Sequence, residues 1–102
     1  MDFVTLDPWE IVLEVLYDAD REVTFKEIQA TCGEREDAQR LNWTEILGAP
    51  YCRDIAIAIR AVRGLGFAEV VLGREERYRI SEDGKEVVKH WRRDERHNIA
   101  RG

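Results

Sequence analysis

The segment that follows Pro50 constrains the fold more than any other part of the chain. Apolar side chains recur at helical spacing between residues 51 and 65, which predicts a helix with one buried face. That face consists of Ile55, Ala58, Ile59 and Val62. Gly66 stands where helices commonly end on a left-handed residue, and Phe67 is placed to contact Val62 across that end. We therefore expect the chain to leave this helix in a sharp turn and to become extended at once.

The extended stretch is predicted to be the first arm of a β-hairpin. Residues 67–72 are rich in Val, Phe and Leu, residues 73–76 form a turn, and residues 77–80 alternate charged with apolar side chains. We expect the register that separates the two kinds of side chain. It puts Tyr78 and Ile80 beside Val70 and Leu72, and Arg79 near Glu69. Ser81 can then cap a last helix with Val87, Val88 and Trp91 on its apolar side, followed by a charged, fraying tail over residues 92–102.

Two capped helices are expected before this unit. Asp7 and Glu10 have the spacing of a capping box around Pro8, which predicts a helix that ends near residues 17–20. Its apolar residues lie on two sides, one of them formed by Ile11 and Val15. Thr24 and Glu27 cap a second helix over residues 25–32, with Gly33 as its C-cap. Residues 34–50 are ambiguous and predict one helix, or a short helical turn near residues 42–47 that Gly48 and Pro50 end.

Helices followed by one hairpin and a closing helix indicate an α+β fold in a single domain of residues 1–102, with its core over about residues 7–91. This order resembles the winged helix-turn-helix superfamily, with three to four helices, a two-stranded wing and a C-terminal helix. Three stretches carry the resemblance. Residues 23–28 look like the start of the family's second helix, residues 59–67 like the end of its recognition helix, and residues 78–87 like the second wing strand entering the last helix. No subfamily stands out. The stretch 33–50 departs from the family by exceeding its usual tight turn.

The resemblance implies that the helix over 51–65 reads the major groove of DNA and that the hairpin flanks the backbone. On a helical wheel Arg53 and Arg60 lie opposite the apolar face, with Arg63 at its margin, where arginines can bond guanine or phosphate. Ile57 shares that outer side, where it could touch a thymine methyl, a second subunit or the chain's own residues 34–47, and we favour the last. The expected DNA-binding residues are Tyr51, Arg53, Asp54, Ile57, Arg60, Arg63, Arg74, Arg77 and Arg79. The implied function is transcription regulation, without an enzymatic activity or a cofactor, in a monomer or a homodimer joined through its first or last helix.

Charge leaves a second reading open. The net charge is −5, which counts against nucleic acid, and the arginines could simply solvate a helix. Residues 1–48 carry four Lys/Arg against twelve Asp/Glu, whereas residues 49–102 carry twelve against nine, so a local basic face is also expected. The alternative function is a protein-interaction winged helix or adaptor without DNA binding. Its contact residues would be Ile11, Val15 and Ile57, or the C-terminal helix.

Other classes of site have weak support. The chain's soft metal ligands are Cys32, Cys52, His90 and His97, whose spacings do not match a structural zinc site, so we expect no metal and two buried thiols. No apolar run approaches the roughly 18 residues of a membrane span. The start Met1-Asp2-Phe3 lacks the features of a signal peptide, and we expect a cytoplasmic protein.

Overall fold

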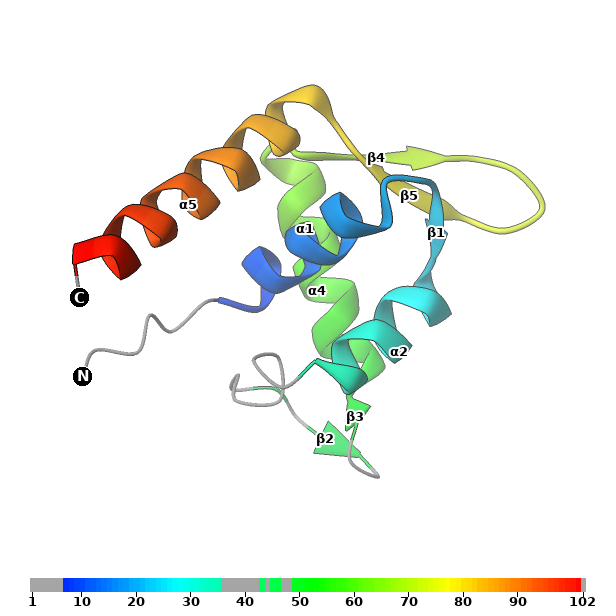
Figure 1. Ribbon diagram of the computed structural model, residues 1–102. Coiled ribbons are helices and arrows are strands. Elements are labelled where there is room, and N and C mark those ends of the chain that lie inside the picture. The colour runs from blue at the N-terminus through cyan, green and yellow to red at the C-terminus, as the bar shows by residue number, and fades with distance from the viewer. Residues whose placement is uncertain (1–6, 36–42, 44, 47–48, 102) are drawn as a thin grey trace.

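The computed structural model describes residues 7–35, 43, 45–46 and 49–101, with the backbone alone for 45–46, 49–50 and 93–101 (Figure 1). In this part of the chain four helices accompany a three-stranded antiparallel sheet and a separate two-stranded one. The helices are α1 (Pro8–Ala19), α2 (Phe25–Glu34), α4 (Cys52–Gly64) and α5 (Glu82–Arg101). The strands are β1 (Val23–Thr24), β2 (Glu45–Ile46), β3 (Ala49–Pro50), β4 (Ala68–Val71) and β5 (Arg77–Ile80). The α+β class is thereby confirmed, in an arrangement compatible with a winged-helix-like fold.

Helix α1 forms the centre of the domain. It begins as predicted, because the Asp7 backbone N–H donates to the Glu10 carboxylate at 3.0 Å, and it ends before Asp20, whose φ of 50° is left-handed. Its two apolar sides pack against α4, α2, α5 and β5. Ile11 and Val15 are consequently buried at 0% and 4% exposure. Their candidacy as partner-binding residues was wrong, since a helix covered on several sides keeps neither stripe for a partner.

Helix α2 has the expected start but a different end. The Thr24 hydroxyl accepts from the Glu27 N–H at 3.3 Å, and the Glu27 carboxylate accepts from the Thr24 N–H at the same distance. The predicted C-cap at Gly33 is wrong. The helix continues through Glu34, and the N–H of Arg35 donates to the Thr31 carbonyl at 3.1 Å. Because Arg35 is extended there, the helix ends without needing a left-handed glycine.

Helix α4 turns into β4 in the manner that its sequence predicts. Gly66 has a φ of 80°, and its N–H donates to the Arg63 carbonyl at 3.0 Å. The N–H of Phe67 donates to the Val62 carbonyl at 2.9 Å, which completes a Schellman ending. This turn fixes the position of the hairpin relative to the end of α4.

The three-stranded sheet has the order β1-β5-β4, with Tyr78 in its central strand opposite both Val23 and Val70. Glu69 faces Arg79, as expected. The register differs from the expectation at one end, because Ile80 pairs with Ala68. Leu72 lies beyond the end of β4 and is 81% exposed, so it has no place in the apolar row.

The expected helix near residues 42–47 is wrong where the structure describes it, since Glu45 and Ile46 pair as β2 with β3. The rest of that stretch lies outside the described residues, apart from Trp43, which is buried in the core. Only two residues, one of them Gly48, separate the two strands, which is the spacing of a tight hairpin. The hairpin spacing competes with the helical spacing of Trp43, Ile46 and Leu47, on which the expected helix was based.

Helix α5 begins at Ser81, whose hydroxyl accepts from the Gly84 N–H at 3.1 Å and donates to the Gly66 carbonyl at 2.7 Å. A side chain at Gly84 would overlap the Phe67 carbonyl, so glycine is needed for α5 to pack on the α4–β4 turn. The helix continues through Arg101 and projects from the rest of the domain (Figure 1). Arg92, expected to be part of a solvated tail, instead binds Asp18 of α1 at 2.6 Å.

Candidate nucleic-acid interface

The outward side of α4 carries three arginines. The inward side chains Ile55, Ala58, Ile59 and Val62 are buried, and α1 and α4 form the most extensive helix contact of the domain. Because an α-helix turns about 100° per residue, this packing places Arg53, Arg60 and Arg63 toward solvent, and all three are exposed. We call these three residues the α4 arginine row.

No carboxylate among the described residues forms an ion pair with the α4 arginine row. Guanidiniums without a partner keep their full donor capacity and their charge for a ligand. Three cations along the solvent side of one helix can therefore contact an anionic surface without first breaking an internal bond.

The hairpin of β4 and β5, hereafter the wing, adds two further exposed arginines. Arg74 and Arg77 have no ion pair within the described part of the chain, whereas Arg79 donates to the Glu69 carboxylate at 2.9 Å. Arg79 was expected to contact the DNA backbone, and its pairing with Glu69 makes it the weakest of the three wing candidates.

Sequence reasoning missed one polar contact of the wing. The Tyr78 hydroxyl donates to the Glu76 carboxylate at 2.8 Å, although Tyr78 itself is only 6% exposed. Burial, and then this hydrogen bond, raise the pKa of Tyr78 above its ordinary value, while the charge of Arg63 acts in the opposite direction. The alternation of residues 77–80 predicted that Tyr78 faces inward. No sequence pattern indicated that its hydroxyl would bond Glu76.

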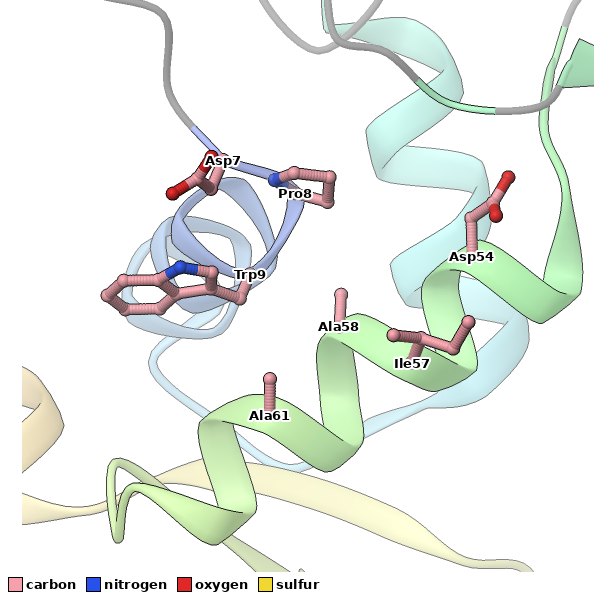
Figure 2. A pocket seen from close by; sticks show the side chains of 7 residues that line it. All are labelled: Asp7, Pro8, Trp9, Asp54, Ile57, Ala58 and Ala61. Carbon is pink, nitrogen blue, oxygen red and sulfur yellow. The ribbon is translucent and has the colours of Figure 1, made fainter.

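The remaining predicted site residues lie on another flank of α4. Tyr51 is the N-cap of the helix and is 38% exposed. Asp54 and Ile57 line a mostly apolar groove of about 300 Å³ between α4 and the first turn of α1 (Figure 2). Burial of Ile57 beneath residues 34–47 was the favoured expectation and is wrong, because the side chain is 56% exposed. The outer side of α4 is thus divided between an arginine flank and this groove.

Of the two thiols expected to be buried, Cys32 is buried and Cys52 is exposed at the start of α4, so the expectation was wrong for Cys52. Within the described ranges, no three side chains of His, Cys, Asp or Glu gather in a way that could hold a metal ion. None of the helices that the structure describes is both long and apolar enough to cross a bilayer.

Comparison with known proteins finds no family model that matches the chain and no curated protein that matches it. The functional assignment accordingly depends on the geometry of this chain's own residues.

Proposed function

We propose that this chain is a winged helix-turn-helix protein that binds double-stranded DNA and acts in transcription regulation, with α4 in the major groove and the wing beside the backbone. The observation that carries the proposal is the α4 arginine row, which is exposed and has no ion pair within the described residues. The order of α4, β4, β5 and α5, with the Schellman turn between α4 and β4, supports it. In this docking the α4 arginine row supplies base or phosphate contacts, and Arg74 and Arg77 supply phosphate contacts.

The net charge of −5 does not oppose this proposal, because residues 1–48 sum to −8 whereas residues 49–102, which contain α4 and the wing, sum to +3. Glu14 and Asp18 pair with Arg35 and Arg92, at the contact of α1 with α5 and the end of α2. In addition, the Glu27 carboxylate is bonded by Arg21, and that of Glu69 by Arg79. A polyanion responds to the local field within roughly 10 Å at moderate salt rather than to the total charge.

Binding of a mixed-sequence duplex, followed by fluorescence anisotropy at low salt, tests the proposal. We expect R60A/R63A to weaken binding by at least about 30-fold, since each arginine contact with a base or phosphate contributes on the order of 1 kcal/mol or more. The matched control is K85A/K89A, which removes two positive charges from α5, where both lysines bond carboxylates of their own helix.

When the variants are compared at about 0.1 M salt, the control is expected to bind within about twofold of the wild-type protein, because a remote change in net charge is then largely screened. Equal losses in the two double variants would show a response to total charge alone, and would contradict a site on α4. A wild-type protein that binds no duplex at low salt would end the proposal.

The groove beside Ile57 supports a second candidate function, a protein-interaction module. Ile57 is a large apolar side chain that is more than half exposed on a helix, and the partly exposed Pro8, Trp9 and Ala61 extend the apolar surface around it. Sedimentation velocity over a range of concentrations would detect self-association through this surface. Loss of an observed dimer in I57E, with an unchanged circular dichroism spectrum, would support the alternative, and a monomer at all concentrations would remove the homodimer.

A further inference from the structure

Tyr78 is a buried side chain of the wing. It lies in β5, the central strand, with Val23 of β1 opposite on one side and Val70 of β4 on the other. Its ring belongs to the core and is 6% exposed. A tyrosine held by two neighbouring strands and by the core has a fixed position beside the loop over residues 72–76. Its hydroxyl is therefore a fixed hydrogen-bonding group next to that loop.

The hydroxyl is bonded to the last residue of the loop. Glu76 directly precedes β5, and its carboxylate accepts from the Tyr78 hydroxyl at 2.8 Å. Residues two apart along an extended chain point to the same side, so this bond draws the carboxylate back along the strand. Arg63, in the last turn of α4, lies close enough to act electrostatically on Tyr78. Tyr78 and Glu76 thus join the central strand to the end of the wing loop, within the electrostatic reach of Arg63.

We propose that Tyr78 is a positioning residue of the DNA interface, which holds the Glu76 carboxylate away from the phosphates and keeps the wing in place beside α4. This inference rests on the proposed function, because it assigns a role within the same interface. Neither Tyr78 nor Glu76 needs to touch DNA. The proposed role depends only on the position of the Glu76 carboxylate relative to the DNA phosphates.

The charges of the wing loop explain why this position matters. Its exposed charged residues are Arg74, Glu75, Glu76 and Arg77, so the two signs balance. A carboxylate that is free to swing toward the duplex cancels the attraction of one arginine. While Tyr78 bonds Glu76, that carboxylate is held at the Tyr78 hydroxyl in the central strand, and Arg74 and Arg77 outweigh the single remaining Glu75. The bond therefore gives the outer surface of the wing a net positive charge.

A double-variant cycle separates this role from a merely structural one. Y78F removes the hydroxyl and leaves Glu76 charged and free, so we expect duplex binding to weaken about threefold, the size of one exposed charge interaction. Y78F/E76Q should recover wild-type affinity, because the released side chain is then neutral. E76Q alone should bind as tightly as the wild-type protein or slightly more so. Y17F, which removes the hydroxyl of a tyrosine on α1, is the matched control and should leave affinity unchanged.

A second measurement needs no DNA. The pKa of Tyr78, followed by NMR titration of its ring carbons, should fall in E76Q because the charge and hydrogen bond of Glu76 contribute to its raised value. An unchanged pKa in E76Q would show that the contact is absent in solution and would overturn the inference. If the wild-type protein binds no duplex, the proposed function fails and the positioning role fails with it. If the wild-type protein binds but Y78F and Y78F/E76Q bind the duplex equally weakly, only the positioning role is overturned.

Discussion

Two groups of arginines on this small domain are used in opposite ways. Arg35 at the end of α2 and Arg92 of α5 bond the carboxylates of Glu14 and Asp18 on α1, at N–O distances from 2.6 to 4.0 Å. We call these four residues the α1 charge cluster. Its central carboxylate, Glu14, is 9% exposed, and the Arg92 guanidinium also lies 4.9 Å from the centre of the Tyr17 ring. The α4 arginine row has no such partners among the described residues.

The difference shows that partners, rather than residue type, decide what an arginine does. A guanidinium whose donors are taken by a buried carboxylate links two helices and contributes to folding. An exposed guanidinium without a carboxylate contributes little to folding and retains its attraction for external anions. We therefore expect substitutions in the two groups to have separable effects, one on binding and the other on stability.

The largest effect is expected from charge reversal in the α4 arginine row. R60E/R63E should weaken duplex binding by more than about 100-fold, because it removes two attractive contacts and adds two repulsive ones. Thermal unfolding should stay within about 0.5 kcal/mol of the wild-type value, as is usual for exposed sites without partners. A large loss of stability in this variant would mean that the row has a structural role, and would remove the contrast between the two groups.

The next effect is expected in the α1 charge cluster. R92A leaves the Glu14 carboxylate with Arg35 and removes the bond to Asp18, so the free energy of unfolding should fall by about 1–2 kcal/mol. Chemical denaturation measures this change. Duplex affinity at a temperature where the variant is folded should be unchanged, since Arg92 lies on α5 and contacts α1. Weaker binding by folded R92A would place α5 in the interface, and the two groups of arginines would then no longer have separate roles.

The sequence predicted the local signals of this fold better than its long-range contacts. The caps at Asp7, Thr24 and Ser81, and the glycine ending at Gly66, depend on residues three to five apart, and the structure confirms them. The arginine side of α4 followed from helical periodicity in the same way.

Contacts between distant residues were not readable from the sequence. Arg92 and Asp18 are 74 positions apart, and no spacing rule indicates that they meet. The exposure of Ile57 depended on where residues 34–47 lie, and the competing signals there predicted a helix where the structure has β2. For the same reason, the sequence did not show which arginines have carboxylate partners and which do not, and the candidate interface depends on that distinction.

A smaller effect is expected on the flank between the two groups. I57A should change the free energy of unfolding by no more than about 0.5 kcal/mol, because the side chain is already 56% exposed. Duplex affinity should change less than about threefold, since Ile57 lines the groove beside α1 and carries no charge that could bond a phosphate. An anisotropy titration measures this, and a loss comparable to that of R60A/R63A would extend the interface across the groove.

The smallest effect concerns a paired carboxylate at the surface. The hydrogen bond from Arg21 lowers the pKa of Glu27 below its ordinary value of 4.5. A carboxyl group with a lowered folded-state pKa stabilises the fold above its unfolded pKa, and this contribution is lost as the pH falls through the folded value. The melting temperature should therefore fall less between pH 6 and pH 3 in E27Q, in which glutamine still permits the capping box. Parallel pH profiles for E27Q and the wild-type protein would contradict this assignment.

The salt dependence of duplex binding tests the central claim most directly. Each phosphate contact that a cation makes contributes about 0.9 to the slope of log K against log salt concentration. If the α4 arginine row contacts phosphates, the slope for R53A/R60A/R63A should be shallower than that of the wild-type protein by about 2 to 3. R35A, which removes a partnered arginine, should keep the wild-type slope. Equal slopes for the triple variant and the wild-type protein would contradict the claim that these unpartnered arginines form the nucleic-acid surface.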